Sequence, residues 1–124
     1  MFLDEVKNLL DESLEKLKTA EILFENDRYD DAISRAYYAM FYSAKALLTE
    51  RKIHPKTHKG VKNQFGMEFV KNSNFSVDIF RFFVQLQQDR QDADYEVLIK
   101  FNRNQARNAL DRAEIFINEC KNFE

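Results

Sequence analysis

The sequence has 124 residues, a formal net charge of −2 at pH 7, and only two glycines and one proline. A chain of this length suits one domain, residues 1–124, and so few helix breakers together with 32% charged residues favour long helices. The charge provides no overall attraction for nucleic acid, so such binding needs a local basic patch, and no apolar run is long enough to cross a membrane.

The apolar residues recur at spacings of three and four, which predicts an all-α, up-and-down bundle of four to five antiparallel helices. We expect helices at residues 2–25, 29–50, 58–69, 76–93 and 102–121. Thr57 and Asn102 stand at N-cap positions, and Gln105 completes a capping box with Asn102. Residues 94–101 fit either a continuation of the fourth helix or a loop. The residues expected to face the core from the first and fourth helices are Leu3, Val6, Leu10, Leu14, Leu17, Ala20, Phe24, Ile79, Phe80, Phe83, Val84 and Leu86.

The second predicted helix is apolar around nearly its whole circumference, which is typical of a central helix enclosed by others. Its one polar face is also aromatic and carries Arg35, Tyr38 and Tyr42. Such a face can stack on bases of single-stranded nucleic acid, form a protein interface, or pack against a neighbouring helix. We predict a protein interface here.

The segment around the start of the third helix is basic and carries Lys56, His58 and Lys59. A helix N-terminus offers backbone N–H groups and the positive end of its dipole to an anion. We therefore expect these three residues to contact a nucleotide or RNA, the alternative being an ordinary solvated loop.

Arg90 lies on the apolar stripe of the fourth helix, where the spacing from Phe83 and Leu86 predicts a core residue. A buried guanidinium needs a partner, because an isolated buried charge is very costly. One interpretation is a structural ion pair with Asp94, four residues later, or with an acid on another helix. The other is a phosphate ligand, since the planar guanidinium can bind two phosphate oxygens at once.

The histidines and the acidic cluster do not predict a metal site. His54 and His58 are four residues apart, but Pro55 between them interrupts the helix that a shared zinc-binding face requires. The three aspartates of residues 89–94 do not share one helical face. We therefore predict no metal and no cofactor.

Two features indicate a cytoplasmic protein that does not associate with membranes. The single Cys120 cannot form an intramolecular disulfide, which fits a reducing compartment, and its place on the apolar stripe of the last helix predicts a core residue. The N-terminus contains acidic residues by position four and lacks a basic region followed by a long apolar run, so it is not a signal peptide.

Several segments resemble the HEPN domain family, and the resemblance covers nearly the whole chain. They are SRAYYAMFYSAKALL in the second helix, HPKTHKGV around the start of the third, DRQDADYE at the end of the fourth, and the alanine-rich last helix. The nearest match is the small stand-alone bacterial and archaeal branch. The resemblance implies a helical bundle that forms homodimers, and many such proteins pair with a minimal nucleotidyltransferase as toxin and antitoxin.

The active members of this family are metal-independent ribonucleases. Their motif is an arginine followed four to six residues later by a histidine, and two copies of it meet across the dimer. Arg90 matches the arginine, but no histidine stands in the window after it. A missing general acid or base typically costs a factor of about 10²–10⁴ in rate. In related branches a tyrosine near the motif receives nucleotidyl groups, and Tyr95 lies close to that position at a different offset.

These observations favour a HEPN-type binding module that dimerises, pairs with a nucleotidyltransferase and binds a nucleotide or RNA. Arg90 would hold a phosphate or an acidic partner, Asp94 would orient Arg90, and Tyr95 would stack or be modified. One alternative is a metal-independent endoribonuclease toxin whose acid–base group comes from elsewhere, with His58 as the candidate. Another is a scaffold that only dimerises.

Overall fold

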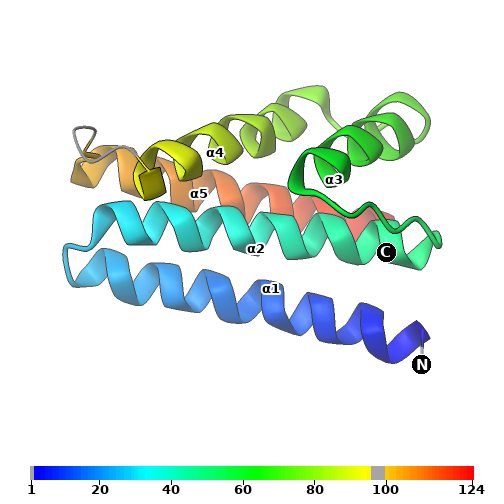
Figure 1. The fold of residues 1–124 in the computed structure, drawn as a ribbon, viewed down its shortest axis with the longest axis horizontal. Coiled ribbons are helices and arrows are strands. Elements are labelled where there is room, and N and C mark those ends of the chain that lie inside the picture. The colour runs from blue at the N-terminus through cyan, green and yellow to red at the C-terminus, as the bar shows by residue number, and fades with distance from the viewer. Residues whose placement is uncertain (1, 96–99) are drawn as a thin grey trace.

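The computed structural model of this chain describes residues 2–95 and 100–124. Within them lie the helices α1 (Phe2–Glu25), α2 (Tyr29–Glu50), α3 (His58–Phe65), α4 (Val77–Tyr95) and α5 (Arg103–Cys120). A π-helical segment, Gly66–Lys71, extends α3, and a 3₁₀ turn, Lys121–Phe123, follows α5. Figure 1 shows α1, α2, α4 and α5 running alternately in opposite directions, with the short α3 alongside α2. The prediction of an all-α, up-and-down bundle is confirmed.

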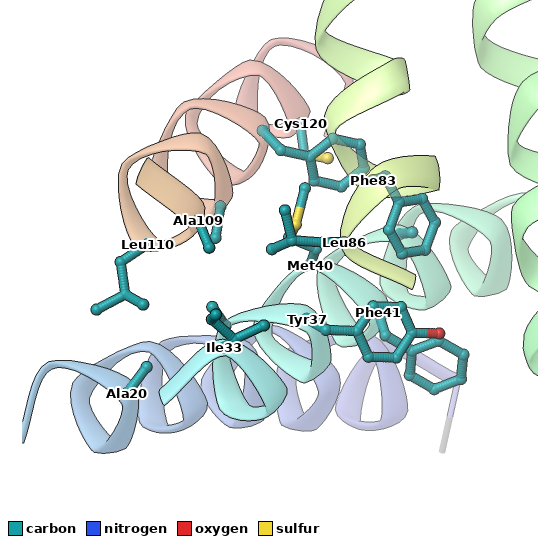
Figure 2. Packing of buried hydrophobic residues seen from close by; sticks show 14 of the residues in the cluster. Ala20, Ile33, Tyr37, Met40, Phe41, Phe83, Leu86, Ala109, Leu110 and Cys120 are labelled. Atoms are coloured by element: carbon teal, nitrogen blue, oxygen red, sulfur yellow. The ribbon is translucent and has the colours of Figure 1, made fainter. Parts of the chain in front are cut away.

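Helix α2 is the centre of the bundle and contacts α1, α3, α4 and α5. Five alanines of α2 are fully buried, and their small side chains let neighbouring helices approach closely: Ala32, Ala36, Ala39, Ala44 and Ala46. Figure 2 shows Ile33, Tyr37 and Met40 of α2 pointing toward the helices that carry Leu86 and Leu110. The predicted role of this segment as an enclosed central helix is therefore confirmed.

A cluster of phenylalanine rings closes the bundle where α3, α4 and α5 meet. The Phe65 ring lies 4.8 Å from that of Phe69 and 5.5 Å from that of Phe116, measured between ring centres. Phe83 of α4 lies 5.1 Å from Phe116. Aromatic pairs at these separations add to the stabilisation from burial alone. The cluster fixes how α3 and α4 sit on each other and so positions the site described below.

The helix boundaries agree with the expected ones except in the third helix. The capping box of Asn102 and Gln105 and the N-cap at Thr57 are both present. The α-helical hydrogen bonding of α3 ends at Phe65, and the chain continues as a π-helix instead of an α-helix. A Cβ atom on Gly66 would lie 3.0 Å from Cζ of Phe80, so glycine permits the close packing at this point. Helix α4 extends to Tyr95, and residues 96–99 of the uncertain segment lie outside the described residues.

Three predicted core residues are exposed, and these predictions were wrong. The exposed fractions are 74% for Leu3, 46% for Leu14 and 37% for Val84. Figure 1 shows α1 at the edge of the bundle, where neighbours cover only part of its circumference. The apolar stripe of α1 is wider than this contact area, and Val84 lies at the margin of the buried face of α4.

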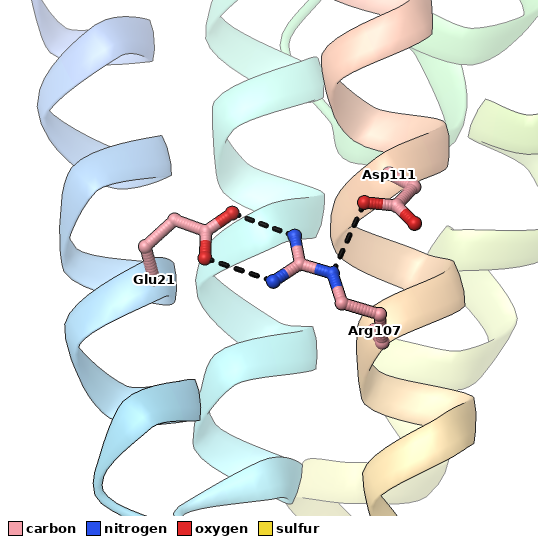
Figure 3. A network of polar contacts seen from close by, with 3 residues as sticks. All are labelled: Glu21, Arg107 and Asp111. Atoms are coloured by element: carbon pink, nitrogen blue, oxygen red, sulfur yellow. Dashed lines mark hydrogen bonds and ion pairs between the residues drawn. The ribbon is translucent and has the colours of Figure 1, made fainter.

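An ion pair between two side chains ties α1 to α5 (Figure 3). Arg107 donates two hydrogen bonds to the carboxylate of Glu21, with N···O distances of 2.7 and 3.0 Å, and a third of 3.0 Å to Asp111. The guanidinium carbon also lies 4.7 Å from the centre of the Phe24 ring. The hydrogen bonds from Arg107 lower the pKa of the Glu21 carboxyl, although partial burial opposes this. Bidentate geometry makes this pair stronger than an ordinary surface contact.

Replacing Glu21 by glutamine is expected to lower the free energy of unfolding by about 0.5–1 kcal/mol at pH 7, because both partners are partly solvated. Since the pKa of Glu21 is lower in the folded state, this difference is present above 4.5, its ordinary value, and disappears as the pH falls through the lowered pKa. Urea unfolding of both proteins over this pH range measures the effect. Glu15→Gln is the matched control, because its exposed pair with Lys18 has a 3.7 Å separation. An equal effect of the two changes would contradict the prediction.

Candidate functional site

Arg90 is a charged side chain inside the core of the bundle, with an exposed fraction of only 7%. Phe83 and Leu86, on the same face of α4, are buried, so packing of α4 on α2 places the guanidinium among aromatic rings. Its central carbon lies 5.0 Å from the centre of the Tyr37 ring and 5.7 Å from that of Tyr38. The prediction that Arg90 occupies a core position is confirmed.

The charge of Arg90 is paired, but its hydrogen-bonding capacity is not exhausted. Nη1 lies 3.7 Å from Oδ2 of Asp94, which is the predicted partner at i+4. That separation is longer than the roughly 2.7–2.9 Å of a strong charge-assisted hydrogen bond. Nε is buried and has no hydrogen-bond partner in the part of the chain that the structure describes. The aromatic rings offset part of the cost of burying the charge. Donors therefore remain for an anion.

His58 lies next to this arginine in space, although the two are far apart in the sequence. It is the first residue of α3, whose start is fixed by the N-cap bond from the Gly60 N–H to Thr57 Oγ1 at 2.9 Å. The imidazole stacks on Phe41, with ring centres 4.2 Å apart. Its Nδ1 lies 2.7 Å from the hydroxyl oxygen of Tyr37. Tyr37 thus contacts His58 through its hydroxyl and Arg90 through its ring.

The protonation states of Tyr37 and His58 follow from their surroundings. Burial raises the pKa of Tyr37 to about 12, although the nearby positive charge of Arg90 opposes the shift, so the hydroxyl stays protonated at neutral pH. Burial, followed by the charges of Arg90 and Lys45, lowers the pKa of His58, which favours the neutral imidazole. The Tyr37–His58 bond then has two forms. Either the hydroxyl donates to Nδ1 and leaves a proton on Nε2, or Nδ1–H donates to the hydroxyl and leaves Nε2 as an acceptor.

Tyr38 connects this site to the aromatic face of α2. Its ring centre lies 5.8 Å from that of His58 and 6.4 Å from that of Tyr42. We refer to the group described so far as the Arg90 cluster; its members are Arg90, Asp94, Tyr37, Tyr38 and His58. Figure 2 shows Tyr37 and Phe41 on α2, on the side that faces Phe83 of α4.

The remaining predicted site residues lie around this cluster. Tyr95 ends α4 with 72% of its surface exposed. Lys56, Lys59 and Arg35 are exposed, and Tyr42 is half-buried. His58 belongs to the same basic segment as the two lysines, and its ring is stacked on Phe41 of the aromatic core. The geometry separates an inner group of polar residues from an outer rim of exposed ones.

Two residues of this region were not predicted from the sequence as site residues. Tyr37 stands on the apolar face of the second helix, where its position predicts a core residue. A buried phenol needs a hydrogen-bond partner, and this need could have indicated that Tyr37 contacts a polar residue. Gln87 is 8% exposed and lies one turn before Arg90 on α4, and its buried Oε1 has no partner among the described residues. A second polar residue on the same apolar stripe was the signal for Gln87.

Within residues 2–95 and 100–124, no group of three or more His, Cys, Asp or Glu side chains is arranged to hold a metal ion. None of the helices in these ranges combines the length and apolarity that crossing a membrane requires.

The family model described as HEPN domain matches residues 6–123. Two relatives from Methanocaldococcus jannaschii bear the name "Putative toxin": one is 36% identical over 96% of this chain and 81% of its own length, the other 40% identical over 95% and 87%. A UPF0332 protein from Thermotoga maritima is 32% identical over 83% of this chain and 78% of its own. The crystal structure of TT1696 from Thermus thermophilus matches with a TM-score of 0.84 at 16% identity, over 96% of this chain and 98% of that one, which shows a shared fold.

The burial of His58 makes the stability of the protein depend on pH. Because the pKa of His58 is lowered in the folded state, the unfolded chain binds this proton more readily. The free energy of unfolding is therefore expected to decrease as the pH falls through 6.5, the ordinary value of the imidazole pKa. Chemical unfolding of the wild type and of His58→Gln between about pH 7.5 and 5.5 should give a smaller decrease for the variant. His54→Gln removes the only other histidine and should keep the wild-type decrease; identical pH profiles for all three proteins would contradict this account.

Proposed function

This chain belongs to the HEPN domain family, and we propose that it is the HEPN component of a toxin–antitoxin-like system in which the Arg90 cluster binds a phosphate group of RNA or of a nucleotide. The single observation that carries this proposal is the buried Arg90, whose Nε has no partner among the described residues and whose ion pair with Asp94 is long. The names of the two archaeal relatives support the toxin-like assignment.

The surroundings of Arg90 fit an oxyanion better than they fit a purely structural role. A structural arginine is usually satisfied by short bonds to carboxylates or carbonyls, as Arg107 is by Glu21. In the form with a proton on Nε2, His58 would add a further donor near the same anion. Asp94 would orient Arg90 and would be partly displaced when the phosphate binds. The aromatic rings lower the local dielectric constant and so strengthen the attraction.

The exposed residues around the cluster would guide the rest of the ligand. Lys56 and Lys59 would attract the nucleic acid backbone, and their contribution would fall with increasing salt. Tyr95, exposed at the end of α4, would stack on a base or accept a modification.

A ribonuclease is the second candidate, and the contact between His58 and Tyr37 favours it. The histidine expected after Arg90 in the chain is absent. His58, however, contacts the hydroxyl of Tyr37, and the Arg90 guanidinium lies over the ring of the same tyrosine. In the form where Nδ1–H donates to Tyr37, Nε2 of His58 would accept the proton of a ribose 2′-hydroxyl as that oxygen attacks the phosphorus. A 2′,3′-cyclic phosphate would form while the P–O5′ bond breaks, and the leaving 5′-oxygen would take a proton from water. Arg90 would stabilise the negative charge that develops on the phosphoryl oxygens. The two candidate functions thus require opposite forms of the Tyr37–His58 bond.

The proposals of a homodimer and of a partner protein rest on the family membership and on the aromatic face of α2. Arg35 is exposed, and Tyr38 and Tyr42 are half-buried. Aromatic residues and arginine are enriched in protein interfaces. We propose that this face forms the homodimer, beside the Arg90 cluster to which Tyr38 belongs, and that the protein pairs with a minimal nucleotidyltransferase.

Arg90→Lys is expected to weaken binding of a fluorescent mixed-sequence RNA by about tenfold or more, because lysine keeps the charge but loses the planar pair of donors. Fluorescence anisotropy without metal ions measures the affinity, and gel analysis of the same samples detects cleavage. Arg81→Lys is the matched control, since Arg81 is an exposed arginine of α4 paired only at 3.4 Å with Asp78.

The outcomes of this assay distinguish a ribonuclease, a binding module and a purely structural role of Arg90. Cleavage by the wild type that is lost in both Arg90→Lys and His58→Gln would establish the ribonuclease. Binding without cleavage would support the binding module. An unchanged affinity in Arg90→Lys together with a lower melting temperature would show that Arg90 is only a structural ion-pair residue and would refute the phosphate site.

Tyr42→Ala is expected to weaken the homodimer by about tenfold or more, since a central aromatic side chain commonly contributes over 1 kcal/mol to an interface. Sedimentation velocity over a concentration series measures the monomer–dimer equilibrium. Ile22→Ser changes an apolar side chain of α1 that is 59% exposed and should leave the equilibrium unaltered. A dimer constant insensitive to Tyr42→Ala would exclude this residue from the interface.

A further inference from the structure

A hollow of about 270 Å³ lies between α3 and α4. Its lining consists of two lysines, four glutamines and one valine: Lys59, Lys62, Gln85, Gln87, Gln88, Gln91 and Val84. The lining contains amide and ammonium groups but no carboxylate, so it suits a ligand that is anionic or rich in hydrogen-bonding groups and does not suit a metal ion. The volume is below the roughly 300–1,000 Å³ of sites for whole drug-sized ligands, which favours one ring system.

Gln87 is the lining side chain that indicates a ligand site in this hollow. It is 8% exposed, it lines the hollow, and its Oε1 is buried without a hydrogen-bond partner among the described residues. A buried amide oxygen without a partner costs about 1–3 kcal/mol. Because Oε1 has less than 1 Å² of accessible surface, a ligand that presents an N–H group in the hollow would remove this cost only once the amide rotates toward it. Two of the exposed glutamines of the lining, Gln85 and Gln88, differ from Gln87, since their amide nitrogens each donate a 3.0 Å bond to an aspartate of α4.

The hollow adjoins the Arg90 cluster along both helices that form it. Gln87 precedes Arg90 by three residues on α4, and Lys62 follows His58 by four residues on α3. Each pair is separated by about one helical turn of 5.4 Å. A phosphate at Arg90 and a ring in the hollow would therefore lie about one helical turn apart, a separation that the phosphate and base of one nucleotide can span.

We propose that this hollow is a nucleobase subsite that binds adenine, with Gln87 as the residue that reads the base; this inference rests on the proposed phosphate site at Arg90. A glutamine amide combines a donor and an acceptor and pairs with the adenine N6 amino group and N7 together. With its amide rotated toward the hollow, Gln87 accepts a hydrogen bond from N6 at Oε1, which then has a partner, and donates one from Nε2 to N7. Val84 provides apolar contact for the ring, and Lys59 and Lys62 attract the negatively charged backbone.

Isothermal titration with adenosine 5′-monophosphate, uridine 5′-monophosphate and ribose 5-phosphate tests this subsite, because ribose 5-phosphate carries the phosphate without a base. The wild type is expected to bind adenosine 5′-monophosphate about tenfold more tightly than either other compound, as one bidentate base contact provides. In Gln87→Met, which keeps the side-chain length but removes the amide, the three affinities become equal. Gln64→Met changes an exposed glutamine of α3 outside the hollow and keeps the wild-type preference.

A second measurement uses only the wild type and therefore does not depend on whether a variant folds. With wild-type protein and adenosine 5′-monophosphate, we expect nuclear Overhauser effects between the adenine ring protons and the Val84 methyl groups. The adenine subsite would be overturned if the wild type bound adenosine 5′-monophosphate no more tightly than ribose 5-phosphate or than uridine 5′-monophosphate. Absence of these nuclear Overhauser effects while the nucleotide is bound would also overturn it. If the wild type binds none of the three compounds, or binds them unchanged in Arg90→Lys, the phosphate site itself fails and the base subsite fails with it.

Discussion

The near-complete burial of α2 is the constraint on which the rest of this structure depends. A helix with neighbours around most of its circumference must present small residues where they approach closely and large ones where they leave space, and α2 alternates buried alanines with Ile33, Tyr37, Met40 and Leu47. Its contacts with the four other helices fix the positions of α3 and α4 on one side and of α1 and α5 on the others. The site is a result of this arrangement, because Tyr37 reaches both α3 and α4 from the centre of the bundle.

The Arg90 cluster shows how a helical bundle can hold a charge in its interior. The guanidinium lies over two tyrosine rings, where the attraction of a cation to the aromatic faces replaces part of the lost hydration. Asp94 supplies a partial counter-charge from the next turn of the same helix. This arrangement stabilises the charge without occupying all its donors, whereas Arg107 has its donors directed to two carboxylates. This contrast between the two arginines is the reason why we propose ligand binding for Arg90 and a stabilising role for Arg107.

Much of the fold follows from local patterns, and the site follows from them only in part. Helix positions and caps are local properties, so the periodicity of apolar residues and the Thr57 and Asn102 caps predicted them correctly. The π-helix after Phe65 depends on the Phe80 ring against Gly66, a contact between distant residues that periodicity does not contain. Arg90 was found because a charge on an apolar stripe is visible in the sequence. The contact of His58 with Tyr37 was not found, because it requires knowing how α3 crosses α2.

The position of α2 near the start of the chain and the position of α5 near its end have a consequence during synthesis. Residues 29–50 leave the ribosome well before residues 103–120, and until α5 emerges the face of α2 that α5 contacts stays uncovered. At about 5–20 residues per second, the growing chain carries this uncovered apolar surface for several seconds. Native packing of α2 then completes only after α5 has emerged, so this apolar face stays exposed to solvent during that interval.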